Sequence, residues 1–254
     1  MTALLEIEAL TRAFYGVAVL RGVTLTVAPG SFTGLIGPNG AGKSTLFNVI
    51  SGLYPAEGGA VRFHGADITR QGADGRVRAG LIRSFQLARG FPKLSVFQHL
   101  MLHGPAQPGD RLWPALAGTR AARDHEAALA EEALAIARRL RLDHVIDNPV
   151  TALSGGQKKL LEIGRALMAR PRLILLDEPM AGVNPSLAQD IGAHLTAINR
   201  EGITILLIEH DMALIGRLCD PVIVMADGRV LAQGSFEAVA ANTDVQEAYL
   251  GRRH

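Results

Sequence analysis

Runs of apolar residues along the chain predict an α/β protein. Residues 4–9 and 23–27 alternate between apolar and polar positions, as half-buried strands do. Residues 60–69 add a short strand and a turn. The runs at 173–176 and within 203–211 are continuously apolar, which is typical of parallel strands buried on both faces. Both runs end in acidic or histidine residues, and open α/β sheets bind ligands beyond the carboxyl ends of such strands.

Helical periodicity predicts the longer helices. Residues 121–142 place Leu129, Ala133, Ile136 and Leu140 on one face, and a second helix runs from Ser154 until Pro171 ends it. The remaining expected elements are a strand at 33–37, a helix at 42–51, a strand at 82–85, a helix after Pro185, a hairpin at 221–234 that turns at Asp227-Gly228, and a last short helix ending near Leu250.

The segment 87–152 differs in character from the rest of the chain. Its first part is rich in proline and glycine, and its second part is the amphipathic helix. We therefore expect one domain of 254 residues, in which 1–86 and 153–254 form the α/β core with an N-terminal antiparallel β subdomain. Residues 87–152 are expected to form a helical subdomain inserted into that core.

Composition excludes several classes of function. Hydrophobic residues make up 48% and charged residues 20%, as in a globular protein with a substantial core. The net charge of +2 gives no support for a nucleic-acid partner. Cys219 is the only cysteine, so an internal disulfide is excluded. The sequence has neither a secretory signal nor an apolar run of ~18–20 residues, so we expect a cytoplasmic protein that a partner holds at any membrane.

The glycine-rich sequence GPNGAGKS, residues 37–44, matches the phosphate-binding pattern G-x-x-x-x-G-K-[ST]. Its glycines let backbone N–H groups surround phosphates, Lys43 reaches the β- and γ-phosphates, and the Ser44 hydroxyl ligates Mg²⁺. The expected contacts with ATP are Gly37, Pro38, Asn39, Gly40, Ala41, Gly42, Lys43, Ser44 and Thr45.

Acidic and histidine residues end the two buried strands. Asp177 is suited to the Mg²⁺ shell, and Glu178 to a general base that activates water for attack on the γ-phosphate. His210 ends the next strand and should lie beside them, where it would contact the γ-phosphate. Gln86 could sense Mg²⁺ and water, although its spacing alone does not decide this.

A helix that begins with two glycines is unusual, because each costs roughly 1 kcal/mol relative to alanine. Here Ser154 is a good N-cap and Gln157 stands three residues later, as in a capping box. Either Gly155 and Gly156 belong to a loop that runs into the helix, or an anion approaches bare backbone at the helix N-terminus.

LSGGQ (153–157), with GPNGAGKS upstream and LILLDEP downstream, resembles the nucleotide-binding subunits of ATP-binding-cassette (ABC) transporters over nearly the whole chain. The resemblance implies that Ser154, Gly155, Gly156 and Gln157 bind the γ-phosphate of ATP held by a second ATPase subunit, so that two ATP molecules are buried in a head-to-tail dimer.

The same resemblance implies further roles. Gln86 would link the Mg²⁺ site to the helical subdomain, so that the metal residues are Ser44, Gln86 and Asp177, and the catalytic residues are Lys43, Gln86, Glu178 and His210. Phe14 would stack on adenine, with Tyr15 as the alternative. Asn184 stands where the family commonly has aspartate.

Further stretches, among them EIGRALMARP, LLIEHDM and DVQEAYLG, resemble the longer ATPase type of branched-chain amino-acid importers. The implied partners are an identical or paralogous ATPase subunit, two membrane permeases and a periplasmic solute-binding protein, at the cytoplasmic face of the inner membrane. Alternatives are an ATPase of the lipopolysaccharide-export type or a soluble ABC ATPase. A GTPase is disfavoured because no Asn-Lys-x-Asp motif occurs, and a small-molecule kinase would not need LSGGQ.

Overall fold

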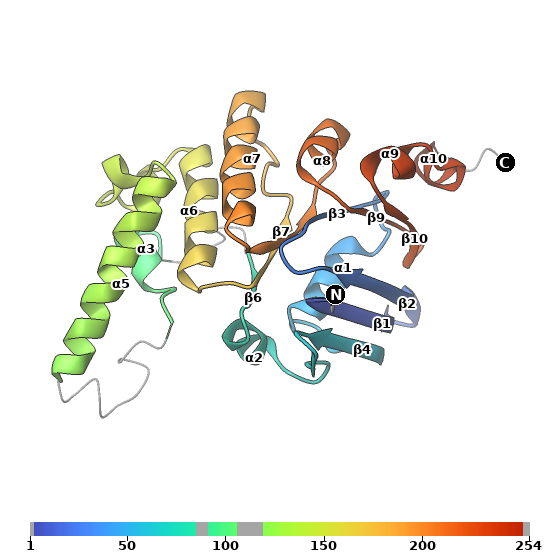
Figure 1. Cartoon of the computed structure of the whole chain (residues 1–254), viewed down its shortest axis with the longest axis horizontal. Coiled ribbons are helices and arrows are strands. Elements are labelled where there is room, and N and C mark those ends of the chain that lie inside the picture. The colour runs from blue at the N-terminus through green and yellow to red at the C-terminus, as the bar shows by residue number, and fades with distance from the viewer. Residues whose placement is uncertain (1–2, 85–90, 106–118, 251–254) are drawn as a thin grey trace. The chain divides into compact units, whose positions relative to one another are not determined.

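The computed structural model describes residues 3–84, 91–105 and 119–250. The chain divides into two compact units (Figure 1). The first unit comprises residues 1–83, 172–181 and 192–254, and the second comprises 84–171 and 182–191.

A six-stranded sheet forms the centre of the first unit. Its strand order is β10-β9-β3-β8-β7-β6, parallel except for β10 at one edge. The apolar runs predicted as buried strands form its middle, where every residue of β3 and β8 is buried. The strands are β3 (Phe32–Ile36), β6 (Leu81–Arg83), β7 (Leu173–Asp177), β8 (Thr204–Ile208), β9 (Val222–Ala226) and β10 (Arg229–Gly234).

A smaller antiparallel sheet has the order β2-β1-β4-β5. It consists of β1 (Leu5–Phe14), β2 (Val17–Val27), β4 (Gly58–Phe63) and β5 (Ala66–Asp67). Its apolar face joins one core with α1 (Lys43–Ile50) and with residues of the larger sheet such as Leu35 and Leu206. Burial therefore fixes the helix after the phosphate loop between two sheets, as Figure 1 shows.

The first unit has further short helices around these sheets. They are α2 (Ala73–Arg78), α8 (Met212–Leu218), α9 (Phe236–Ala240) and α10 (Thr243–Leu250). The predicted hairpin turn is confirmed, because Asp227 and Gly228 both have positive φ (49° and 75°), as a type I′ turn requires. The predicted final helix near Leu250 is confirmed as α10.

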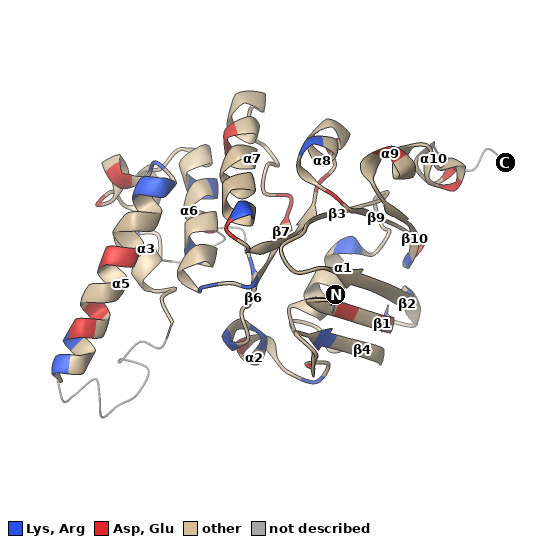
Figure 2. Cartoon of the chain, viewed as in Figure 1, with Lys and Arg blue, Asp and Glu red and all other residues tan. Residues whose placement is uncertain are grey.

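Helices make up the second unit. They are α3 (Val96–Met101), α5 (Arg120–Arg139), the 3₁₀ turns η2 (Asp143–Val145) and η3 (Val150–Ala152), α6 (Gly155–Met168), and the start of α7 (Pro185–Arg200), whose remainder belongs to the first unit. The amphipathic pattern predicted helix α5, whose buried residues include Leu129, Ala133 and Ile136. The arginines of α5 lie toward its two ends, with its Asp and Glu residues between them (Figure 2), so it presents no basic stripe.

The bounds of the second unit differ from the predicted subdomain. Residues 153–171 cluster with α3 and α5, whereas the sequence analysis assigned them to the α/β core. The helical subdomain predicted at 87–152, as an insertion into the α/β core, stays a prediction. In the described ranges, we find no helix with the length and apolarity needed to cross a bilayer.

Candidate active site

The glycine-rich loop joins the end of β3 to the start of α1. Gly42 is the N-cap of α1, with φ of 96° and no capping side chain, so the first N–H groups of the helix are left for a ligand. Gly37 is required for a different reason, because a Cβ there would collide with the carbonyl oxygen of Met225. The loop thus offers free backbone N–H groups to a ligand, and at Gly37 it packs closely against the backbone of Met225.

Lys43 is folded back onto this loop. Its Nζ donates to the carbonyl oxygens of Gly37 (2.7 Å) and Pro38 (3.0 Å), and the residue is only 7% exposed. Burial lowers the pKa of Lys43, and the nearby charges of Glu178 and Asp177 oppose that shift. The two carboxylates of the β7 end therefore act electrostatically on the lysine of the phosphate loop.

Strands β7 and β8 are adjacent and parallel, with Asp177 paired to Ile208. The predicted proximity of their carboxyl ends is confirmed, because Nε2 of His210 lies 2.8 Å from Oε1 of Glu178. Figure 2 shows acidic residues on the segments that follow both strands. An ionised carboxylate only accepts hydrogen bonds, so Nε2 of His210 carries the proton in this contact.

Glu178 has a left-handed backbone conformation, with φ of 49°. Such a conformation in a residue other than glycine costs on the order of 1–3 kcal/mol and persists where the surroundings enforce it. Here the N–H of Glu178 donates to Ile208 O (3.0 Å), and its own carbonyl accepts from Ala181 (3.1 Å). The neighbouring strand β8 thus fixes the direction in which the Glu178 side chain leaves the backbone.

Asp177 is held by a residue that the sequence analysis did not single out. Nη2 of Arg83, at the end of β6, donates to Oδ2 of Asp177 at 3.0 Å, and Nη1 of the same arginine donates to Oδ1 of Asn48 in α1. Arg83 therefore ties the acidic strand end to the helix after the phosphate loop. The pairing of β6 with β7, unknown from sequence alone, brings these groups together.

The predicted capping box at Ser154 is confirmed. Oγ of Ser154 accepts from the N–H of Gln157 (3.2 Å), and Oε1 of Gln157 accepts from the N–H of Ser154 (2.9 Å). The two glycines between them differ. A Cβ on Gly155 would meet nothing within 4 Å, whereas one on Gly156 would collide with the side chain of Leu187.

The two aromatic candidates lie at the β1–β2 turn. Tyr15 is fully exposed, with φ of 51°, and Gly16 follows with φ of 82°. The Phe14 ring packs edge-on against Tyr54 (5.3 Å between centroids), and the Arg12 guanidinium lies 4.8 Å above the Phe14 ring.

The remaining predicted site residues have simple placements. Ser44 and Thr45 lie in the first turn of α1. Asn184 accepts the N–H of Leu187 at 2.9 Å as α7 begins. Gln86 lies outside the described residues, so its two predicted roles stay predictions.

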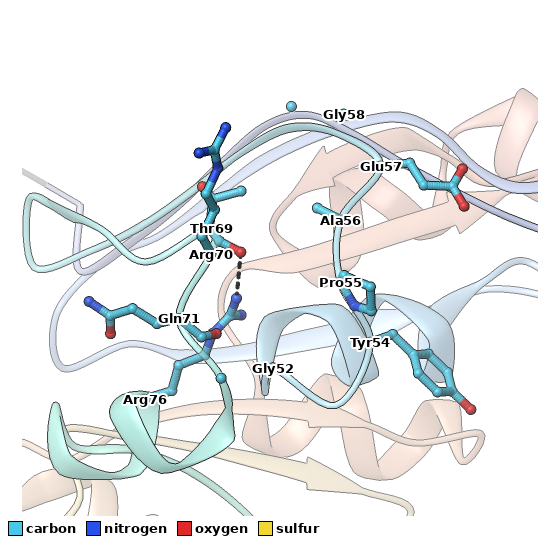
Figure 3. Close-up of a pocket in the computed structure, with 12 residues that line it drawn as sticks. Gly52, Tyr54, Pro55, Ala56, Glu57, Gly58, Thr69, Arg70, Gln71 and Arg76 are labelled. Carbon is cyan, nitrogen blue, oxygen red and sulfur yellow. Dashed lines mark hydrogen bonds between the residues drawn. The ribbon is translucent and has the colours of Figure 1, made fainter.

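A pocket of about 450 Å³ lies in the first unit, and none of the predicted site residues is among those that line it. Figure 3 shows its lining, to which Tyr54, Gln71 and Arg76 contribute. The buried Arg76 guanidinium donates to five backbone carbonyl oxygens, including those of Val49 and Ile50 at the C-terminal end of α1. A cation there is favourable for the helix dipole, so Arg76 stabilises α1.

Comparison with known proteins decides the family. The family model described as ABC transporter matches residues 20–181. The chain belongs to the ABC transporter family. A second model, the branched-chain amino acid ATP-binding cassette transporter, matches residues 229–254. The predicted family resemblance, fold class and ATPase activity are confirmed by this membership and by the relatives below.

Relatives of this ABC protein match it from end to end. The probable branched-chain amino acid transport ATP-binding protein LivG of Methanocaldococcus jannaschii is 38% identical, covering 98% of this chain and 97% of the relative. The high-affinity branched-chain amino acid transport ATP-binding protein BraF of Pseudomonas aeruginosa is 37% identical, covering 98% of each. The ADP conformation of MJ1267, an ATP-binding cassette of an ABC transporter, superimposes with a TM-score of 0.85 at 37% identity, covering 99% of this chain and 100% of that one.

Family membership implies that this ABC ATPase binds nucleotide and works with membrane permease partners. Sequence reasoning missed three residues that contact the candidate site, namely Arg83, Glu209 and Tyr249. Each acts through a contact between segments far apart in the chain. Glu209 and Tyr249 lie in LLIEHDM and DVQEAYLG, two stretches that carry the family resemblance, but the sequence assigned no role to either residue.

Proposed function

We propose that this chain is the ATP-hydrolysing subunit of an importer for branched-chain amino acids or related small amino-acid-like solutes. The observation that carries the proposal is the match of its C-terminal residues 229–254 to the branched-chain amino acid transporter model. The end-to-end similarity to LivG and BraF supports the same substrate class.

ATP would be bound by the loop 37–42 and the first turn of α1. The free N–H groups there are suited to phosphate oxygens. Lys43 would exchange the carbonyl oxygens of Gly37 and Pro38 for the β- and γ-phosphates, so that nucleotide replaces a preformed internal contact. Phe14 would pack on adenine, with the exposed Tyr15 as the alternative.

The residues present fit a Mg²⁺ ion that arrives with the nucleotide. Among the described residues, no cluster of three or more His, Cys, Asp or Glu side chains could hold a metal. Mg²⁺ usually takes only one or two protein oxygens together with phosphates and waters, so Ser44 and Asp177 suffice, with Gln86 as a third ligand. When bound, the ion would neutralise charge on the β- and γ-phosphates.

Glu178 would accept a proton from the attacking water. Its exposed carboxylate directly follows β7, and its charge raises the pKa of Lys43 against the effect of burial. His210 would hold that carboxylate through Nε2 and contact the γ-phosphate. Positioning and electrostatic stabilisation, rather than covalent chemistry, would provide most of the rate enhancement.

Two subunits, identical or paralogous, would close head to tail over two ATP molecules. The exposed Ser154 and Gly155, at an N-terminus with free N–H groups, would meet the γ-phosphate bound by the partner. ATP would favour the closed dimer and hydrolysis would release it, which drives two permeases fed by a periplasmic solute-binding protein. The complex would lie at the cytoplasmic face of the inner membrane, without nucleic acid.

The test is transport by the assembled complex. The chain is co-expressed with candidate permeases from the same genome, purified with them, and placed in proteoliposomes with a candidate solute-binding protein. We expect ATP-dependent accumulation of radiolabelled leucine, isoleucine or valine, and none with the Glu178→Gln variant. Movement of lipopolysaccharide instead, or co-purification with no membrane protein at all, would contradict the proposal.

A further inference from the structure

A buried carboxylate lies directly behind the Glu178–His210 pair. Glu209 immediately precedes His210 at the end of β8, and it is only 6% exposed. Its Oε1 accepts the backbone N–H of Met180 at 2.9 Å, and its Oε2 accepts the backbone N–H of His210 at 3.3 Å. Both oxygens thus point at main-chain amides beside the two candidate catalytic side chains.

The first of these contacts fastens the turn that carries Glu178. Met180 stands two residues after Glu178, whose left-handed φ of 49° needs enforcement. The N–H of Glu178 is bound to Ile208 O at 3.0 Å, and the N–H of Met180 is bound to Glu209. The turn is therefore tied to β8 on both sides of the strained residue, once by main chain and once by the Glu209 side chain.

The second contact fixes the other member of the pair. The N–H of His210 donates to the same carboxylate, so one side chain holds the backbone from which the imidazole extends and the turn from which Glu178 extends. The 2.8 Å contact between Nε2 of His210 and Oε1 of Glu178 bridges these two backbones.

We propose that Glu209 is a positioning residue of the ATPase, which sets the geometry of Glu178 and His210 through the amides of Met180 and His210. The inference rests on the proposed function, because the positions of Glu178 and His210 affect catalysis only if Glu178 activates the attacking water. Glu209 itself lies behind the pair and acts on the nucleotide through it.

The chemistry of the contact predicts a graded series of variants. Glu209→Ala leaves the buried N–H of Met180 and the part-buried N–H of His210 without this acceptor. Glu209→Gln keeps one acceptor oxygen but turns an NH₂ group toward the other N–H, so it restores one contact of the two. A positioning role therefore predicts that kcat decreases from wild type to Glu209→Gln to Glu209→Ala. The KM for ATP should change little, because the phosphate loop is untouched.

The experiment measures steady-state ATPase of the purified full chain, alone and with its permeases. We expect Glu209→Ala to lower kcat by about tenfold or more while the KM for ATP stays within about twofold, as when an interaction made only in the transition state is lost. Glu162→Gln is the matched control, because Glu162 is a similarly buried carboxylate in the second unit. This variant should keep kcat within about twofold of wild type, because substitutions at distant sites without shared contacts act independently to within about that factor.

Single-turnover hydrolysis of radiolabelled ATP then tests whether Glu209 acts through Glu178. If it does, the double variant Glu209→Ala/Glu178→Gln hydrolyses ATP no slower than Glu178→Gln alone, within about threefold. Multiplied losses, a raised KM with unchanged kcat, or an equal loss in Glu162→Gln would each overturn the inference. If Glu178→Gln turns over at the wild-type rate, the proposed role of Glu178 fails and the inference falls with it. A slow Glu178→Gln beside a fully active Glu209→Ala rejects the inference alone.

Discussion

Nε2 of His210 lies 2.8 Å from Oε1 of Glu178, across the carboxyl ends of two adjacent parallel strands. Both side chains are nearly half exposed, so the pair faces solvent while their backbones are fixed by β8. The arrangement leaves one carboxylate oxygen of Glu178 for a water molecule.

The first prediction concerns that oxygen. Glu178→Gln keeps the shape of the side chain but removes its basicity, so ATP should still bind while turnover stops. Loss of general-base catalysis typically costs about 10²–10⁴ in rate. Phosphate release measures turnover, and size-exclusion chromatography with ATP should show accumulated dimer. Turnover near the wild-type rate would show that another group activates water.

The second prediction separates the two glycines of LSGGQ. In Gly155→Ala the new methyl group enters open space, so the fold should be as stable or more stable by up to roughly 1 kcal/mol, the helix preference of alanine over glycine. If a partner's nucleotide docks there, ATPase activity should nevertheless fall by about tenfold or more, the effect of losing roughly 1.4 kcal/mol.

Gly156→Ala should behave differently, because its methyl group would displace Leu187 and destabilise the second unit. Overpacking of this kind typically costs about 1–3 kcal/mol. Thermal unfolding and ATPase rates measured on both variants distinguish the two effects. Full activity in Gly155→Ala would remove the idea that bare backbone at this position receives a phosphate.

These glycines also illustrate how far sequence reasoning extends. Periodicity and continuous apolar runs predicted β7, β8, α5 and α6, because burial on a sheet or helix face imposes a local repeat. Position 156 requires glycine because a larger side chain would collide with Leu187 of α7. No local sequence pattern encodes such a contact between two helices.

The same limit applies to the candidate site. Motifs with fixed spacing identified the phosphate loop and the acidic strand ends, because their geometry is local. Glu209 looked like part of an acidic strand end, and only the pairing of β7 with β8 shows that its carboxylate faces Met180. The strands β1 and β2 extend beyond their alternating segments, because the turn at Tyr15-Gly16 continues their pairing.

The third prediction concerns the C-terminal helix α10. Burial raises the pKa of the Tyr249 phenol to about 12, and the backbone amide of Gly37, which faces the hydroxyl, opposes that rise. Gly37 also accepts from Lys43 and packs on Met225, so Tyr249 holds a central residue of the phosphate loop.

Tyr249→Phe removes only the hydroxyl, and we expect ATP affinity to decrease about five- to tenfold, the equivalent of one neutral hydrogen bond of roughly 1–1.4 kcal/mol. Fluorescence titration with a labelled nucleotide measures the change. Equal affinity in wild type and Tyr249→Phe would show that the contact does not support the loop.

The last prediction concerns pH and two histidines of the second unit, the buried His99 and the partly buried His103. Nδ1 of His103 lies 2.9 Å from the carbonyl oxygen of His99 and so donates, which leaves Nε2 as the acceptor for Arg165 at 3.0–3.1 Å. Burial, and then repulsion from Arg165, lower the pKa of His103 below its ordinary 6.5, and burial also lowers that of His99. The folded state therefore favours the neutral form of both rings.

Below pH 6.5 the unfolded chain binds these protons more readily than the folded chain, so the free energy of unfolding must fall as the pH falls from about 7 through the lowered values. His103→Gln keeps an acceptor for Arg165 but cannot titrate, so the stability of this variant should depend less steeply on pH. Urea unfolding at several pH values between 7.5 and 5 measures the slope, with His64→Asn, at an exposed turn, as the control. If His103→Gln and wild type lose stability in parallel, protonation of His103 does not limit the fold, and Arg165 must tolerate an imidazolium beside it.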